Sequence, residues 1–189
     1  MIAGRLPSLF VALVVLLGAS ALAGCGNKKD IVTSADTEGI YVDAGPLQYQ
    51  VQISRQLNPA DEEDKGYFVG VPDPEGGLKA EETWFAVFVK VWNRTEDSHL
   101  PTNDFEIEDT VGKRYEPVEV GEDNVFAYRA TQIPSGGQLP GIDDVANEGV
   151  IGGSMLLFKL TLDSLANRPL VLHITSEGKP SEAEVDLDV

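Results

Sequence analysis

The sequence predicts an all-β protein, an antiparallel two-sheet sandwich that follows a short N-terminal leader. Several segments alternate apolar and polar residues with a period of two, which places the apolar side chains on one face of a strand. The 19 glycines and 11 prolines among 189 residues suit many tight turns. No segment sustains the 3.6-residue apolar period of an amphipathic helix. About seven strands of this kind fit a sandwich, and a small barrel is the alternative architecture.

Residues 1–24 have the layout of a secretory signal peptide. Arg5 precedes an apolar run over residues 9–17, and small residues follow that run. The run is shorter than the roughly 20 apolar residues that cross a bilayer, so a cleaved signal is favoured over an uncleaved anchor. We therefore expect the mature chain to lie outside the cytoplasm.

The single cysteine of the chain stands where this leader ends. Residues 22–25, Leu-Ala-Gly-Cys, resemble the bacterial lipobox, in which the cysteine becomes the lipidated first residue of the mature lipoprotein. Two or more acyl chains hold a protein stably at a membrane. We expect Cys25 to carry this anchor on the extracytoplasmic face of a bacterial cell membrane. The polar residues 25–39 are then a flexible tether, and residues 40–189 form one folded domain.

The first half of the domain is expected to form an early strand, then a central strand, then a hairpin. Residues 84–92 are apolar on both faces, which indicates a central strand. Residues 105–108 alternate, and residues 109–112 have the aspartate-first, glycine-fourth pattern of a type I turn, which predicts a hairpin that resumes at Lys113. An earlier strand is expected to place four apolar side chains on one face, namely Leu47, Tyr49, Val51 and Ile53.

Three more strands are expected in the second half of the chain. Apolar residues alternate over residues 154–160, 170–174 and 185–189. Residues 163–167 fit one helical turn. The segments between the strands are rich in glycine, proline and acidic residues, as is typical of turns.

Residues 84–95 and 103–117 resemble the immunoglobulin-like domain of unknown function found in bacterial, actinobacterial-type lipoproteins. The shared pattern is a long apolar strand that ends in asparagine, a strand that ends in Asp-x-x-Gly, and a tyrosine shortly after it. The resemblance covers residues 40–189 and implies an immunoglobulin-like β-sandwich. The family has no settled activity, so no functional residue carries over. Three motif residues are expected to have structural roles. Asn93 ends a strand, Gly112 permits the turn, and Tyr115 packs on the core.

The charge of the chain and its lack of motifs exclude several classes of function. With 31 acidic residues against 14 basic ones and a net charge of -17, the chain has little to offer a phosphate backbone, so nucleic-acid binding is excluded. A lone cysteine excludes an internal disulfide. The sequence holds no nucleophile elbow, phosphate loop or cofactor motif, so we expect neither an enzyme nor a bound cofactor.

The candidate metal ligands are scattered along the sequence. His99 and His173 lie far apart and have no cysteine partner, so ordinary surface histidines are expected and no metal site is predicted. The acidic runs 61–64 and 143–144 offer oxygen ligands for calcium, but neither has the spacing of a calcium loop. A solvated run of charge is the favoured interpretation of each.

The outward side chains of the central strand are the candidates for partner binding. If its valines face the core, then Trp84, Phe88 and Trp92 lie on the outer face, and Met155 and Leu157 lie on a similar outer face. This apolar row is either a partner-binding patch, with the three aromatic residues as its candidates, or a surface that a loop or another strand covers. Cover is the favoured interpretation, because monomers rarely leave such patches in water.

The sequence favours a non-catalytic, lipid-anchored binding module of the cell envelope. Its expected partner, besides the membrane that holds the anchor, is another envelope protein or a wall component. The alternative is a ligand- or metal-binding accessory lipoprotein of a surface transport system. An enzyme ranks third, because it would need converging titratable groups with perturbed pKa values, which only a structure could show.

Overall fold

The computed structural model describes residues 30–188, which fold as two β-sheets with few helices. The expected signal peptide, Cys25 and Val189 lie outside the described residues. Among the described residues, no helix has the length and apolar character needed to cross a membrane. The expected fold class, an antiparallel β-sandwich, is confirmed.

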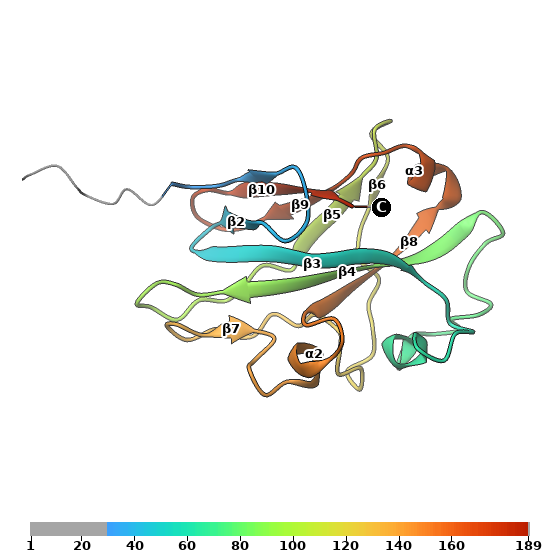
Figure 1. Cartoon of the computed structure of the whole chain (residues 1–189), viewed down its shortest axis with the longest axis horizontal. Helices are drawn as coiled ribbons and strands as arrows, with labels where there is room; N and C mark the ends of the chain where they lie inside the picture. The colour runs from blue at the N-terminus through green and yellow to red at the C-terminus, as the bar shows by residue number, and fades with distance from the viewer. Residues whose placement is uncertain (1–29, 189) are drawn as a thin grey trace, which may run out of the picture. The chain divides into compact units, whose positions relative to one another are not determined.

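The first sheet, here called sheet A, has five strands in the order β1, β10, β9, β5, β6 (Figure 1). All neighbours are antiparallel except β1, which runs parallel to β10. The strands are β1 (Ser34–Ala35), β5 (Asp104–Glu108), β6 (Arg114–Tyr115), β9 (Leu170–Thr175) and β10 (Glu182–Leu187).

The second sheet, sheet B, has the order β2, β3, β4, with β7 and β8 pairing along different parts of the far edge of β4. All of its pairings are antiparallel. Its strands are β2 (Tyr41–Ala44), β3 (Leu47–Leu57), β4 (Glu82–Trp92), β7 (Gln138–Leu139) and β8 (Ser154–Thr161). The expectation that residues 84–92 form a central strand is confirmed, because β4 has neighbours on both sides.

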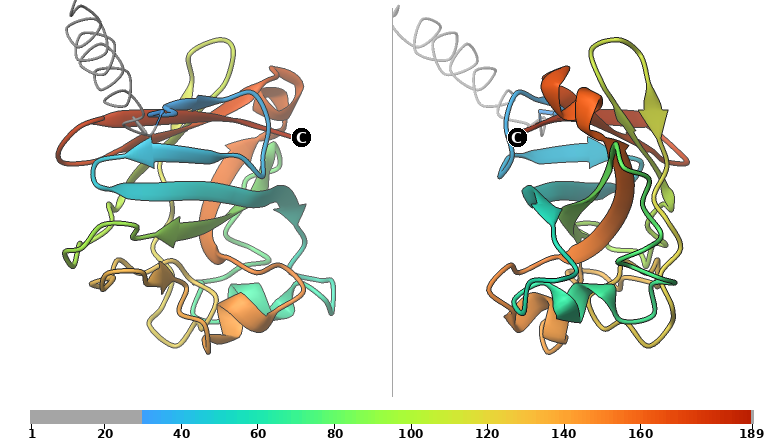
Figure 2. Two further views of the ribbon diagram at one scale, coloured as in Figure 1. Left: turned by 60° about the vertical axis from the view of Figure 1, so that its left-hand side comes forward. Right: turned by 90° about the vertical axis from the view of Figure 1, so that its right-hand side faces the viewer.

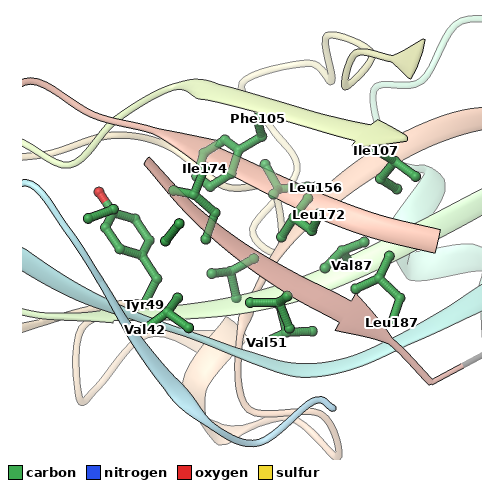
Figure 3. Close-up of a cluster of buried hydrophobic side chains, with 14 of the residues drawn as sticks. Val42, Tyr49, Val51, Val87, Phe105, Ile107, Leu156, Leu172, Ile174 and Leu187 are labelled. Atoms are coloured by element: carbon green, nitrogen blue, oxygen red, sulfur yellow. The ribbon is translucent and has the colours of Figure 1, made fainter. Parts of the chain in front are cut away.

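The main core lies between the two sheets (Figure 3). Alternate residues of each strand point into it, as the period of two predicts. From sheet A it contains Phe105 and Leu172, and from sheet B it contains Tyr49, Val87 and Phe158, all at most 2% exposed. The phenylalanine and three valines expected to face the core from β4 are all in this cluster, namely Phe85, Val87, Val89 and Val91.

One strand departs from the expected alternation. The pairing of β3 with β4 shifts register between Val51 and Ile53, as at a β-bulge. Beyond the shift Ile53 pairs with Phe88 and lies on the outer face, where it is 37% exposed, while Ser54 is buried. The prediction that all four apolar residues of this strand share one face is therefore wrong for Ile53, since one extra residue reverses the faces of everything after it.

The predicted hairpin after β5 is present, and its motif residues have structural roles. The carboxylate of Asp109 accepts hydrogen bonds from the N–H groups of Val111 and Lys113, and Gly112 has the positive φ of 83° that the turn needs. The hydroxyl of Tyr115 lies 2.6 Å from that of Ser164, which belongs to the expected helical turn, α3 (Leu162–Ala166).

Asn93 follows the last residue of β4 and is buried, as its expected role at a strand end requires. Its side-chain amide donates hydrogen bonds to the backbone carbonyls of Asp97 and Ile133. These bonds hold the loop after β4 against the segment that leads to β7.

The outer face of sheet B is covered by loops. A second apolar cluster lies there, beneath η1 (Lys65–Phe68) and near α2 (Val145–Glu148), and Figure 2 shows both short helices on the side of β4 away from sheet A. Trp84 and Phe88 are 1% and 0% exposed, and Trp92 is half-buried. The interpretation of these residues as an exposed partner-binding patch is therefore wrong for Trp84 and Phe88, and the alternative, cover by a loop, is right.

The folded unit begins before residue 40. Ala35 is buried in the main core, and Ser34 and Ala35 pair with β10. Asp43 donates its backbone N–H to the carbonyl of Val32 and accepts the N–H of Val32 on its side chain. The boundary expected at residue 40 is too late, because this short strand carries too few apolar residues to stand out in a polar segment.

Candidate functional site

A cleft with a volume of about 900 Å³ opens at one lateral edge of the sandwich. One wall is the β5 strand of sheet A, and the other is the segment 116–129, which runs beside β8. Clefts of this size are the usual places for ligands and peptide segments.

The β5 wall is partly open because its neighbour is short. The two residues of β6 pair only with Ile107 and Glu108, at the end of β5. Among the described residues no strand pairs with Asp104 or Phe105 on that side. A half-free strand edge of this kind is where an extended peptide can add to a sheet.

The opposite wall is fixed to β8 by backbone hydrogen bonds. Val118 donates to the carbonyl of Leu157, and Tyr128 donates to that of Met155. Arg129 donates from its guanidinium to the backbone carbonyl of Val120, 3.1 Å away. This segment therefore holds a defined position although it contains no regular strand.

Aromatic side chains form the floor of the cleft. The rings of Phe105 and Tyr128 meet edge to face with centroids 5.1 Å apart. The hydroxyl of Tyr128 donates to the carbonyl of Thr102 at 2.7 Å. Burial raises the pKa of Tyr128, so its hydroxyl stays a neutral donor at any physiological pH. Figure 3 shows Phe105 and Leu156 among the side chains of the main core.

The rim of the cleft is acidic. Four exposed carboxylates line it, namely Asp104, Glu116, Glu119 and Glu122. Arg129 is the one basic side chain in the lining, and its guanidinium is engaged by backbone carbonyls. A cationic occupant therefore fits this cleft better than an anionic one.

The three aromatic residues singled out in the sequence lie away from this cleft, whereas Met155 and Leu157, the other members of the expected outer row, are buried and line it. Trp84 packs under the loops, where its indole N–H donates to the carbonyl of Pro74 at 2.8 Å. Phe88 lies beside Tyr67, with ring centroids 5.2 Å apart. Trp92 contacts Tyr41 at a centroid distance of 4.8 Å. The structure thus spreads the three aromatic residues among local packing contacts.

The two acidic runs make local hydrogen bonds. Asp64 is buried and pairs with Arg55, and Asp61 accepts the N–H of Glu63. In the second run Asp144 accepts the N–H of Gly141. Among the described residues, neither run brings three ligand atoms together in the manner of a metal cage.

Sequence reasoning missed a cluster on the outer face of sheet A. The side chain of His173 on β9 is only 13% exposed and lies between carboxylates of the neighbouring strands, so the expectation of an ordinary surface histidine is wrong. The carboxylates are those of Glu108, Glu182 and Glu184. The signal in the sequence was the alternation of acids in these strands, but only the pairing register shows that they meet at one histidine.

A solved structure of another protein shares the fold of this chain. No family model matches the chain, and no curated protein matches it in sequence. The yjhA protein from Bacillus subtilis is similar in structure, with a TM-score of 0.51 at 14% identity over 81% of this chain and 99% of that one. At this identity the likeness shows a shared fold and transfers no functional residue.

Two further solved structures are more distant. A proposed lipoprotein, ycdA, from Bacillus subtilis has a TM-score of 0.45 at 12% identity and covers 77% of this chain, which spans 38% of ycdA. An uncharacterised β-sandwich protein from Clostridium difficile has a TM-score of 0.41 at 10% identity over 85% of this chain and 99% of that one.

Proposed function

We propose that the protein is a lipid-anchored, non-catalytic binding module of a bacterial cell envelope, of the immunoglobulin-like lipoprotein type. We further propose that its lateral cleft takes a basic, extended segment of another envelope protein. The observation that carries this proposal is the combination in one cleft of a half-free strand edge, an aromatic floor and an acidic rim.

The chemistry of the lining favours binding over catalysis. Among the described residues that line the cleft there is no histidine, cysteine, serine or lysine, and its four carboxylates are exposed at the rim. What the cleft offers is backbone groups along an edge, apolar surface and negative charge. These suit a peptide whose backbone pairs with β5 and whose basic side chains meet the rim.

The proposed location depends on the expected signal peptide and on Cys25. The test is Cys25→Ser followed by fractionation of the cells. We expect the variant to leave the membrane fraction for the soluble fraction, because the acyl chains supply the attachment. Unchanged retention in the membrane would contradict the lipid anchor.

Crosslinking in living cells tests the cleft. Tagged wild-type protein is compared with Glu119→Lys/Glu122→Lys, which reverses the rim charge at two exposed positions. The control is Glu62→Lys/Glu63→Lys, which makes the same change of net charge on exposed residues outside the cleft. We expect a specific protein partner that the cleft variant loses and the control keeps.

Other outcomes of this experiment decide against the proposal. Equal loss of the partner in both variants would point to a general effect of net charge. A partner kept by both would place the interface elsewhere. Retention of a wall polymer in place of a protein would assign the cleft to a wall component.

A further inference from the structure

Three strands bring one imidazole and three carboxylates together on the outer face of sheet A. Glu184 on β10 is directly opposite His173 on β9, and Glu182 is two residues away on the same face. On the other side of β9, Glu108 of β5 approaches the same ring. The residues between them point into the core, so the register of the sheet fixes this arrangement.

The distances fit coordination better than hydrogen bonding. His173 Nδ1 lies 3.6 Å from Glu182 Oε1 and 3.5 Å from Glu184 Oε1, and it is a buried atom without a hydrogen-bond partner. These three ligand atoms lie within 4.8 Å of one another. Two ligands of a tetrahedral zinc ion, each about 2.1 Å from the metal, are about 3.4 Å apart. The two separations from Nδ1 match this spacing, and the two exposed carboxylates would close on the ion as it binds.

The other ring nitrogen has the neighbour that a metal-binding histidine usually has. His173 Nε2 faces Glu108 Oε2 at 3.5 Å. Glu108 is itself held by Arg114, whose guanidinium lies 2.7 Å from that carboxylate and 2.7 Å from Glu106. A carboxylate on this side of the ring is the usual arrangement around a metal-binding histidine, and closure of this contact to hydrogen-bond distance would orient the ring and leave Nδ1 free to bind metal.

The ligand set indicates the class of ion. Calcium and magnesium prefer oxygen ligands throughout, whereas an imidazole nitrogen with two carboxylates suits zinc and related first-row divalent ions. Glu182 and Glu184 are half-exposed, at 61% and 49%, so they can adjust to an ion while His173 stays fixed. A hollow of about 210 Å³ borders His173 and Glu184 and has room for a water ligand.

From this geometry we propose that His173, Glu182 and Glu184 form a surface site for a divalent transition-metal ion of the zinc class. His173 binds through Nδ1, each glutamate through one oxygen, and Glu108 positions the ring. Three protein ligands leave a fourth position for water or for a group of a bound partner. The site is separate from the cleft, and neither proposal depends on the other.

Calorimetric titration with zinc chloride tests the site on the full chain in detergent micelles. The wild-type protein is compared with Glu184→Gln and Glu182→Gln, which remove one oxygen ligand each at half-exposed positions. The matched control is Glu177→Gln, an exposed acid in the turn between the same two strands. We expect one zinc ion per wild-type chain, at least about tenfold weaker binding in the two ligand variants, and wild-type affinity in the control.

Glu108→Gln and the ring signals of His173 separate positioning from coordination. We expect Glu108→Gln to weaken zinc binding by about tenfold while it keeps the one-to-one stoichiometry. In nitrogen NMR of the wild-type protein, zinc should shift the Nδ1 signal of His173 far more than the Nε2 signal.

Three results would overturn the proposal. The first is the absence of stoichiometric zinc binding by folded wild-type protein. The second is equal weakening by Glu177→Gln, which would mean diffuse attraction to an acidic surface. The third is a His173 ring whose NMR signals do not respond to zinc, which would mean that the carboxylates hold an imidazolium only.

Discussion

The outer faces of the two sheets differ although both sheets share one core. On sheet B, β4 and β8 present Trp84, Phe88 and Met155 outward, and loops bury all three. On sheet A, β5, β9 and β10 present His173 and its carboxylate neighbours outward, with no second apolar cluster over them among the described residues. An apolar outer face requires a third layer, whereas a charged outer face stays open for ligands.

The difference separates stability from function between the two sheets. The loops over sheet B carry the second apolar cluster, so their role is to complete the packing of a face that water would otherwise contact. The cleft and the histidine cluster both involve sheet A. Substitutions on the covered outer face of sheet B should therefore reduce the free energy of unfolding, and substitutions at the cleft rim or on the outer face of sheet A should change binding.

The largest loss of stability is expected from Trp84→Ala. Trp84 is 1% exposed, its ring meets Phe68 at 5.7 Å, and its N–H is hydrogen-bonded. Removal of a buried indole costs about 3–5 kcal/mol. Urea unfolding of the full chain in detergent measures this, and a loss below about 1 kcal/mol would mean that the loops do not pack on β4 as described.

A smaller loss is expected from Asn124→Ala, which detaches two covering loops from each other. The buried amide of Asn124 donates to the carbonyls of Tyr67 and Val69 and accepts the N–H of Phe126. Without the amide these buried backbone groups lose their hydrogen-bond partners, so the free energy of unfolding should fall by about 1–3 kcal/mol. The same unfolding assay, with the exposed Asn103→Ala as control, checks this, and equal effects of the two variants would contradict it.

The hairpin of sheet A should contribute acid-sensitive stability through Asp109. Burial alone would raise the pKa of Asp109, but the nearby Ser164 hydroxyl and the hydrogen bonds from the N–H groups of Lys113 and Val111 outweigh it and leave the pKa below its ordinary value of 3.8. A lowered native pKa stabilises the fold above the unfolded pKa, and this stability is lost as the pH falls through the native value.

Asp109→Asn should therefore destabilise the protein at pH 6 and have less effect at pH 3. Unfolding of the variant and the wild-type protein at the two pH values measures the difference. A stability gap between them that is independent of pH would show that the hydrogen bonds favour the neutral and charged forms equally.

The smallest effect on stability is expected from Glu184→Gln on the outer face of sheet A. Its carboxylate is half-exposed among other acids, so the change in unfolding free energy should stay within about 0.5 kcal/mol. Metal-free protein is the proper sample for this measurement, since a bound ion would add its own stabilisation. A loss above 2 kcal/mol would mean that the cluster stabilises the fold, and the two outer faces would then not differ in this respect.

The strands were predictable because alternation is a local property of the sequence. Both faces of β4 are apolar, and this pattern indicated a central strand whose outer face is covered. The loops that provide this cover have no periodic pattern, so their position could not be read from their residues. Ile53 continued the apolar alternation past the register shift, and the bulge was hidden for that reason.

The candidate sites were not predictable, because they depend on contacts between distant segments. His173 and Glu108 are neighbours only because β5 pairs with β9, and Glu184 joins them from β10. The cleft arises because β6 is shorter than β5, which leaves part of an edge open. Neither fact is encoded in a short stretch of sequence.

The short strand β1 has a mechanical consequence. The chain enters the folded unit through two residues that run parallel to β10, and only Ala35 of these is buried in the core. We expect a pull on the N-terminal end to break the bonds between Val32 and Asp43 and to detach this strand before the larger sheets open. Release of residues 31–39 would add about 30 Å of reach. If the chain is held at Cys25, pairing or release of β1 sets how far from the membrane the domain can extend.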